Sequence, residues 1–295
     1  PGAKPPGVRT TSEETDVDWE RVIGLGVAGN FAGHLEQAGE ANDFKDLVIE
    51  DAAAPKGVFP FYVPPPAEGD AQHFLHTFPI SSRRIRLGSD DEKHQIEPEV
   101  SLLCDLRYEN GRVSAVVPRQ AHAHNDCSIR REGAKKISEK KNWGRDTKGT
   151  ATQSIAIDRF EPGGVLDQYR IASFLERDGA LHEYGVDSPV SSYSYMYRRL
   201  LDWLVEKLGQ QVDEGPLENI SEWITQAGCP EQALISIGAT RYTDFGETNF
   251  LARGDRSIVV VYDGRRFDHD AIREIASGAQ APPTEGLSLL RQEVV

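Results

Sequence analysis

Glu97 and Glu99, in the stretch HQIEPEVSLLCDL, have a spacing that suits a metal centre. They are two residues apart on an expected strand, so both side chains project from the same face. Two carboxylates held close together repel each other unless a cation or a shared proton compensates, so the pair suggests a hard divalent metal ion. The alternative is an exposed strand edge that carries two solvated glutamates.

A second stretch, AHAHNDCSIRR, alternates His122, His124 and Asp126 along one face of an expected strand. A His-x-His pair permits a transition-metal site. Asp126 is the better oxygen ligand for Mg²⁺, Ca²⁺ or Mn²⁺, so histidine ligation is the minor alternative and a hydrogen-bonded strand face the simpler one. Lys148, in NWGRDTKGTATQ, would by itself be an ordinary surface lysine.

The segment RVIGLGVAGNFAGHLEQAGE contains a G-x-G-x-x-G run formed by Gly24, Gly26 and Gly29. The acidic end of DLVIED, residues 46–51, follows where a dinucleotide-binding fold would grip a ribose. However, the strand-helix alternation of a doubly wound sheet is absent after about residue 52. We therefore interpret the glycines as part of a short strand and a tight turn that deliver Asn30 and His34, with a nicotinamide-dependent oxidoreductase as the minor alternative.

The elements that must position these residues are mostly strands. Strands are expected within residues 83–88, 100–108, 111–117, 154–160, 168–185, 233–240 and 256–264, with hairpin turns at Asn110-Gly111 and Asp178-Gly179. Helical periodicity predicts helices within 194–211, 216–228 and 270–277. The proline-rich residues 54–72 indicate a loop or edge strand, and the Lys-rich residues 132–149 a solvated loop or lid. The expected fold class is strand-rich α+β.

Composition restricts the classes of partner. The chain has 295 residues, 38% of them hydrophobic, and a mean hydropathy of −0.49, as expected for a globular protein. Its 33 Lys and Arg against 47 Asp and Glu give a net charge of −14, which disfavours nucleic acid and anionic membranes. Three scattered cysteines and no signal-like start favour a cytoplasmic location. We expect a mobile N-terminal arm, 1–16, and one catalytic domain, 17–295.

Taken in chain order, these motifs resemble the fumarylacetoacetate hydrolase (FAH) superfamily. The resemblance rests on E-x-E, on the N-D-x-S-x-R pattern and on the later Trp and Lys-Gly, which correspond here to Glu97, Glu99, Asn125, Asp126, Ser128, Arg130, Trp143 and Lys148. It extends backwards to an N-Y-x-x-H segment in GNFAGHLEQAGE and forwards to the G-T and G-D segments in ISIGATRYTDFGETNFLARGDRSIVVVYDG. It therefore spans roughly residues 20 to 263.

The resemblance implies a rolled arrangement of mixed β-sheets with a few peripheral helices, and a homodimer. It also implies the site: metal ligands Glu97, Glu99 and Asp126, catalytic His34 and Lys148, and substrate-binding Asn30, Arg130 and Thr240. The implied cofactor is a divalent cation, Mg²⁺ first, with Mn²⁺ or Ca²⁺ as alternatives. The partner is a small carboxylic acid.

The implied activity is metal-dependent chemistry on a 2-oxo or 1,3-dicarbonyl acid through a metal-bound enolate. Hydrolysis of a carbon-carbon bond, of the acylpyruvate or fumarylacetoacetate type, comes first; a decarboxylase, an isomerase or tautomerase, or a metal-binding member without turnover are the alternatives. One departure bears on this choice. Hydrolytic members place Glu three residues after the histidine, where this chain has Gln37, and Glu36 lies about 200° round a helix from His34. Gln37 is therefore a candidate to orient the water.

Overall fold

The computed structural model describes residues 17–40, 44–45, 51, 53–66, 73–131 and 133–295. Its strands are β1 Ile23–Ala28, β2 Gly57–Tyr62, β3 Ile80–Ser81, β4 Arg84–Ile85, β5 His94–Gln95, β6 Pro98–Glu109, β7 Arg112–Asn125, β8 Ser128–Ile129, β9 Lys148–Thr150, β10 Ile155–Ala156, β11 Tyr169–Arg177, β12 Ala180–Pro189, β13 Gln232–Ser236, β14 Arg256–Asp263 and β15 Leu287–Val294.

Short helices connect these strands. The α-helices are α1 His34–Gln37, α2 Tyr197–Gln210, α3 Ile220–Gln226, α4 Asp244–Thr248 and α5 His269–Ser277. The 3-10 helices are η1 Trp19–Arg21, η3 Phe74–His76, η4 Ile137–Lys140, η5 Val165–Gln168 and η6 Val190–Ser192. The helices predicted within 194–211, 216–228 and 270–277 are confirmed.

The strands form three sheets, of which the two larger ones contain both parallel and antiparallel pairs. Eight strands make the largest sheet, in the order β2-β1-β13-β6-β7-β9-β3 with β10 paired to β7. Five strands make the second sheet, in the order β12-β11-β14-β15-β4, and β5 pairs with β8 in the third. β1 runs parallel to β13, whereas β6 and β7 form a long antiparallel hairpin. The predicted strand-rich α+β fold is therefore confirmed, and the mixed pairing excludes the doubly wound parallel sheet of a dinucleotide-binding domain.

Two predicted turns set the register of the long hairpins. Asn110 and Gly111 have φ of 52° and 76°, and Asp178 and Gly179 have φ of 51° and 78°. Positive φ at both central residues is the type I′ geometry, whose twist matches that of the flanking strands. The first turn joins β6 to β7 and so brings the end of β7 beside the start of β6, at the Pro98–Asn125 pair.

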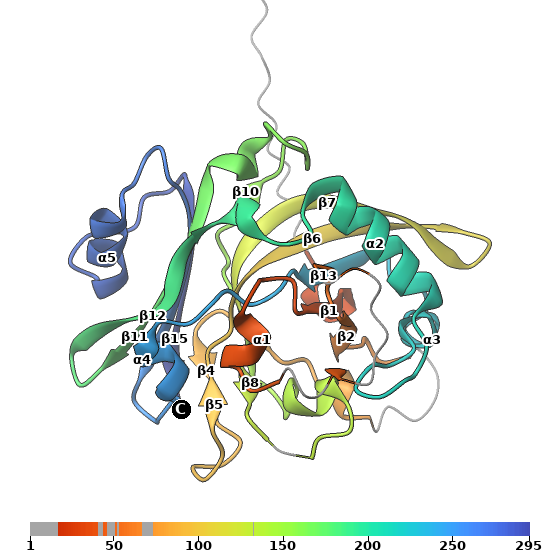
Figure 1. Ribbon diagram of the computed structural model, residues 1–295, viewed down its shortest axis with the longest axis horizontal. Helices are drawn as coiled ribbons and strands as arrows, with labels where there is room; N and C mark the ends of the chain where they lie inside the picture. The colour runs from red at the N-terminus through yellow and green to blue at the C-terminus, as the bar shows by residue number, and fades with distance from the viewer. Residues whose placement is uncertain (1–16, 41–43, 46–50, 52, 67–72, 132) are drawn as a thin grey trace, which may run out of the picture.

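The two faces of the eight-stranded sheet bury different cores. One face packs with the five-stranded sheet and with the apolar side of α2, which includes Leu200, Leu204 and Leu208. The other face contributes Leu103 and Leu234 to a smaller core. Because Glu99 precedes Leu103 by four strand positions, it lies on the face of the smaller core. Figure 1 shows α5 on the outer side of the five-stranded sheet and α2 with α3 at the opposite side of the molecule.

The glycines of β1 have a packing role. A Cβ atom on Gly26 would lie 2.2 Å from the Phe59 ring, and one on Gly24 would lie 2.2 Å from the Phe61 ring. Only a residue without a side chain lets these rings cover the strand. Gly29, with φ of 73°, makes the tight turn that leads into α1. The predicted edge strand within 54–72 is β2, at the end of the sheet.

One prediction was wrong. Residues 132–149 do not form a solvated loop or lid in their described part, 133–149: η4 lies there, and Lys140, Lys141, Asn142 and Lys148 are buried. The ammonium groups of the three lysines turn inward because buried carboxylates pair with them. A Lys-rich composition does not reveal such partners. The arm 1–16 and, except for Asp51, the predicted strand at 46–51 lie outside the described residues.

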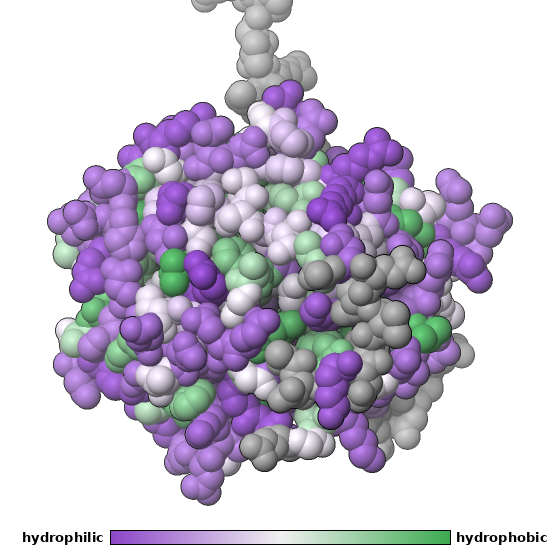
Figure 2. All heavy atoms as spheres, in the orientation of Figure 1, coloured by the Kyte–Doolittle hydropathy of each residue, from purple (hydrophilic) through white to green (hydrophobic). Residues whose placement is uncertain are grey.

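The surface agrees with the acidic, hydrophilic composition. The face seen in Figure 2 is largely hydrophilic, and its hydrophobic residues form small separate patches. Among the described residues, no helix has the length and apolar character needed to cross a membrane.

Candidate metal centre

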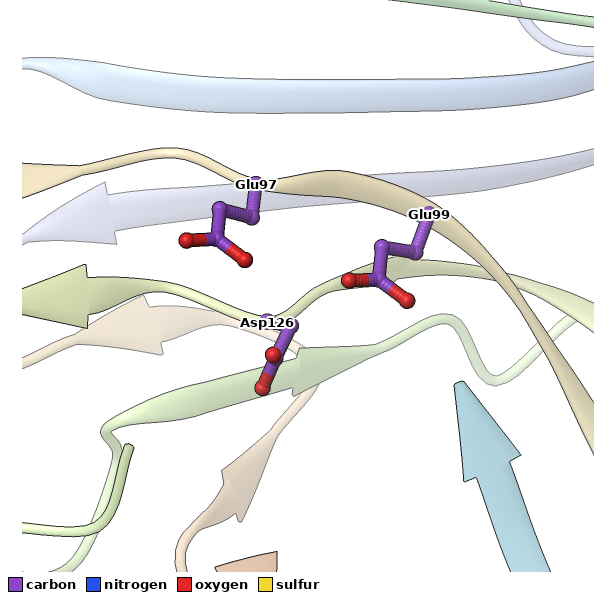
Figure 3. Close-up of side chains that lie close together, drawn as sticks. All are labelled: Glu97, Glu99 and Asp126. Carbon is purple, nitrogen blue, oxygen red and sulfur yellow. The ribbon is translucent and has the colours of Figure 1, made fainter. Parts of the chain in front are cut away.

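Glu97, Glu99 and Asp126, here named the carboxylate triad, lie together at the start of the β6–β7 hairpin. Glu97 directly precedes β6, Glu99 is its second residue, and Asp126 directly follows β7. Their candidate ligand oxygens all lie within 4.8 Å of one another, and the residues are only 3%, 2% and 0% exposed. Figure 3 shows the two glutamates projecting from one stretch of chain and Asp126 from its neighbour. The structure thus brings the three predicted metal ligands together.

Two lysines contact the triad. Lys148 Nζ lies 2.9 Å from Asp126 Oδ1 and also donates to the carbonyl oxygen of Cys127. Lys141 Nζ lies 2.6 Å from Glu97 Oε2 and 2.7 Å from Asp126 Oδ2. Burial lowers the pKa of Lys148 and outweighs the opposing effect of Asp126. Burial also opposes ionisation of Lys141, but Asp126 and Glu97 outweigh it and raise the Lys141 pKa.

Arg130 links the triad to Glu40. Its Nη1 atom lies 2.8 Å from both Glu97 Oε1 and Glu40 Oε1, its Nε donates to Gln95, and its Nη2 donates to the Tyr242 hydroxyl. Lys140 also pairs with Glu40 at 2.8 Å. Burial raises the pKa of Glu40, but Arg130, Lys140 and Lys141 together outweigh it and the net shift is downward. Arg130 is therefore a rigid cation at the edge of the triad.

The two glutamates of the triad differ in pKa. Burial favours the neutral form of both. For Glu97, the nearby Lys141 and Arg130 outweigh burial and lower the pKa. For Glu99, the charges of Asp126 and Glu97 add to burial and raise the pKa well above the usual value. Glu99 accepts one hydrogen bond, from the backbone N–H of Gly238 at 2.8 Å. Without an added cation, Glu99 is therefore the glutamate of the pair whose surroundings favour the neutral form.

The donor set fits a hard divalent cation. It consists of carboxylate oxygens alone, the ligand type that Mg²⁺, Mn²⁺ and Ca²⁺ prefer. Both carboxylate oxygens of Asp126 lie near an ammonium group, yet neither makes a hydrogen bond of good geometry, so lone pairs remain for a metal. Within the residues that the structure describes, this is the only such group of three or more ligands found. His122 and His124 are buried, their Nδ1 atoms pair with Ala151 and Thr150, and neither histidine belongs to this group.

His34 shares a small cavity with Glu97 and Glu99, two members of the triad. The cavity is lined by Glu97, Glu99, Lys141, Glu40 and His34 among others, and its free volume for the centre of a water molecule is about 20 Å³. That is room for a single water molecule. The Nδ1 atom of His34 lies 2.9 Å from the backbone oxygen of Thr240, which can only accept a proton, so Nδ1 carries the hydrogen and Nε2 is an acceptor. Burial lowers the pKa of His34, which keeps the ring neutral.

The remaining predicted residues are tied to the backbone. The amide of Asn30 donates to the carbonyls of Tyr195 and Ile237 and accepts from the Tyr195 N–H. Thr240 is buried, and its hydroxyl lies 3.4 Å from the Pro98 oxygen. Gln37 bonds to both backbone groups of Tyr242 and to Glu247. Asn30 and Gln37 thus fix the chain around His34, and their direct roles in substrate or water binding stay predictions.

Sequence reasoning missed Lys141, Glu40 and Tyr242. Lys141 lies in a run with several other lysines, and nothing in that run distinguishes it. Glu40 is six residues after His34, beyond α1, and it reaches the site because the chain turns at Gly39, where φ is 71°. The Tyr242 ring lies 5.2 Å from the His34 ring, and its hydroxyl donates to the Ile96 oxygen. Only tertiary contacts identify these three residues.

Comparisons with known proteins agree with this architecture. Residues 40–294 match the model of a family described as a family of unknown function, DUF5718. No match was found among curated proteins. A crystal structure of Cg1458 with inhibitor has a TM-score of 0.51 and 14% identity, covering 92% of this chain and 76% of that one. A crystal structure of a 2-keto-3-deoxyarabinonate dehydratase has a TM-score of 0.50 and 12% sequence identity. The match covers 92% of this chain and 73% of the dehydratase chain.

A third structure, from Yersinia pestis CO92, is described provisionally as a fumarylacetoacetate hydrolase family protein. Its TM-score is 0.48 at 10% identity, with coverage of 93% of this chain and 94% of that one. At such low identities the first two structures establish the fold alone. The resemblance to the FAH superfamily is thus confirmed for the fold.

Proposed function

The chain belongs to the DUF5718 family, and from its carboxylate triad and His34 we propose that it is a divalent-metal-dependent enzyme acting on a 2-oxo or 1,3-dicarbonyl acid. The reaction we favour is hydrolysis of a carbon-carbon bond of an acylpyruvate-type substrate through an enolate. The observation that carries the proposal is the small cavity that His34 shares with Glu97 and Glu99 of the carboxylate triad. Hydrolysis through an enolate requires a neutral base to activate water and, close to it, a site for a hard cation that stabilises the enolate.

Glu97, Glu99 and Asp126 would hold the cation, which when bound would supply Lewis acidity to the adjacent oxygens of the 2-oxo acid. We take Mg²⁺ first because the donors are all carboxylate oxygens. Lys148 and Arg130, which contact Asp126 and Glu97, offset negative charge on the enolate and the substrate carboxylate.

His34 is the general base of the hydrolytic step. Its Nε2 atom takes a proton from water, and the water oxygen forms a bond to the distal carbonyl carbon. The carbon-carbon bond then breaks, its electron pair stays with the departing enolate, and the proton on His34 passes to the enolate carbon. The hydrogen bond from Nδ1 to the Thr240 oxygen supports this role because it fixes both the tautomer and the ring orientation.

A larger pocket of about 420 Å³ adjoins this cavity, because Glu40 lines both. Its lining includes Gln37, Arg130, Lys140 and Phe250. We assign the distal substituent of the substrate to this pocket, since the reacting carbons must lie between the triad and His34. A mixed polar and apolar lining suits a substituent with both characters.

A second candidate is decarboxylation or isomerisation through the same enolate. Gln37 stands where hydrolytic members have Glu, and its side chain bonds to Tyr242 and Glu247. These contacts turn its amide away from the role of a carboxylate partner for His34. Reactions that form an enolate without activating water do not need such a partner, so this observation favours them.

Chelator-treated protein should be incubated with acylpyruvates and with oxaloacetate, with and without Mg²⁺. Hydrolysis predicts metal-dependent loss of the enol absorbance with pyruvate and the second acid formed in equal amounts. A His34→Gln variant should lose this activity by at least about 100-fold, since general bases contribute that much. Release of CO₂ from oxaloacetate would favour the second candidate. No turnover with any of these acids would contradict both and leave a metal-binding member without turnover.

A further inference from the structure

Lys141 occupies an unusual position among the lysines of the site. Its ammonium nitrogen bridges two members of the carboxylate triad, at 2.6 Å from Glu97 Oε2 and 2.7 Å from Asp126 Oδ2. Lys148 contacts one triad carboxylate, Asp126, and the main-chain oxygen of Cys127. Lys141 is thus positioned as a cation shared between two of the proposed metal ligands.

The surroundings of Lys141 hold it there. Its side chain is 3% exposed, and it directly follows η4. The Phe59 ring centroid lies 5.1 Å from the ammonium, within range of a cation-π contact. Phe59 in turn packs against Gly26, whose missing Cβ makes room for the ring. The position is therefore built from three separate segments of the chain.

A divalent cation shared by Glu97 and Asp126 would bind the same two carboxylate groups. Mg²⁺ and Mn²⁺ bind carboxylate oxygens at roughly 2.1 Å, so an ion shared by Glu97 and Asp126 would lie close to the present position of the Lys141 ammonium. Two positive charges at such a separation repel strongly in a buried site. The ammonium must leave at least one of the two carboxylates when the cation binds.

We propose that Lys141 is a resident counter-cation that competes with the divalent cation for Glu97 and Asp126, and thereby weakens cation binding at this site. The displaced ammonium would move into the small cavity, which Lys141 lines together with Glu40 and His34. This inference rests on the proposed function only in placing a cation on the triad.

The test measures cation affinity alone, by isothermal titration calorimetry of MnCl₂ into the chelator-treated full chain. Lys141→Met removes the ammonium and keeps the length of the side chain. We expect it to bind Mn²⁺ at least about tenfold more tightly, since removal of the ammonium leaves two buried carboxylates without their counter-charge. Lys140→Met is the matched control: it removes the same charge one residue away, where the ammonium pairs with Glu40. We expect a change of less than about threefold there, because the proposed cation does not compete with Lys140 for Glu40 and a more distant charge acts on it more weakly.

The outcomes separate this inference from the proposed function. If wild type binds Mn²⁺ and Lys141→Met binds it equally or more weakly, the inference is wrong and the proposed function stands. If only Lys141→Met binds, Lys141 is the blocking group and the metal-dependent function of the native chain is contradicted. If neither protein binds Mn²⁺, both proposals fail. An equal gain in Lys140→Met would indicate a general charge effect and would also overturn the inference.

A measurement on wild type covers the case in which Lys141→Met does not fold. A crystal structure of the wild-type chain soaked with MnCl₂ should show the Lys141 ammonium no longer bridging Glu97 and Asp126. An ammonium that still contacts both carboxylates beside a bound Mn²⁺ would overturn the inference. Loss of the bridge with Mn²⁺ on the same oxygens would support it.

Discussion

Two regions of the molecule gather carboxylates around nitrogen cations, and they differ in burial and in whether they favour binding of a further cation. In the carboxylate triad, the paired side chains of Glu97 and Asp126 are 4% and 0% exposed. The second region, here named the His269 cluster, consists of Glu183 and Asp187 on β12 and His269 on α5. Its carboxylates are 37% and 15% exposed, and each lies 2.8 Å from one ring nitrogen of His269.

The difference teaches that burial, more than residue type, makes a cation site. In the His269 cluster each carboxylate has its partners and contact with water: Arg170 and Tyr262 also pair with Asp187, and Arg273 pairs with Glu183. In the triad the side chains are almost fully buried, and oxygens of Asp126 lack a well-formed hydrogen bond. The His269 cluster is therefore complete as a set of ion pairs, whereas the carboxylate triad still favours an added cation.

The largest expected effect is on cation binding. Asp126→Asn should weaken Mn²⁺ binding by at least about 100-fold, because it removes a ligand and not merely a residue that orients one. Asp187→Asn, the equivalent change in the His269 cluster, should leave the affinity unchanged. Calorimetric titration of both variants checks this. Equal affinities for Asp126→Asn and wild type would mean that the comparison between the regions is mistaken.

The next effect is on folding stability. Lys148→Met leaves Asp126 without one buried partner, and breaking a buried pair in this way costs about 3–5 kcal/mol. Arg170→Met removes a partner of Asp187 in the partly hydrated His269 cluster, where such pairs contribute about 1 kcal/mol or less. Urea unfolding of the two variants measures both. Similar losses of unfolding free energy in the two variants would show that burial does not separate the regions.

The sequence predicted much of this architecture because local patterns determine it. The turns at Asn110-Gly111 and Asp178-Gly179 and the apolar periodicity of α2 require no tertiary information. The alternation of Glu97 with Glu99 placed both on one face of the chain. The resemblance to the FAH superfamily then linked them to Asp126.

The rest depended on contacts between distant segments. Lys141 pairs with Glu97, 44 residues away, so its inward orientation has no local signal. The same holds for Glu40, which meets Arg130 at a separation of 90 residues. The Lys-rich composition of 132–149 predicted solvent exposure because composition says nothing about partners that the fold supplies.

The smallest effect is the pH dependence of the His269 cluster. Burial lowers the pKa of His269, but hydrogen bonds to Glu183 and Asp187 outweigh it and the net shift is upward. The charged ring is therefore favoured in the folded state. Its contribution to stability is fully present below about pH 6.5, the unfolded value, and is lost as the pH rises through the higher folded pKa.

Melting temperatures of wild type and His269→Gln at pH 5.5 and 8.5 test this. At pH 5.5 the melting temperature of wild type should exceed that of His269→Gln by about 2 °C or less, as expected for a partly exposed pair in a chain of this size. The difference in melting temperature should be smaller at pH 8.5. An advantage that grows with pH would contradict the assigned charge state.

The central claim is that the carboxylate triad holds a divalent cation, and anomalous diffraction from a crystal soaked in MnCl₂ tests it most directly. The account predicts one strong anomalous peak within about 2.0–2.4 Å of oxygens from Glu97, Glu99 and Asp126. A peak at His122 and His124, or none near the triad at saturating MnCl₂, would contradict it.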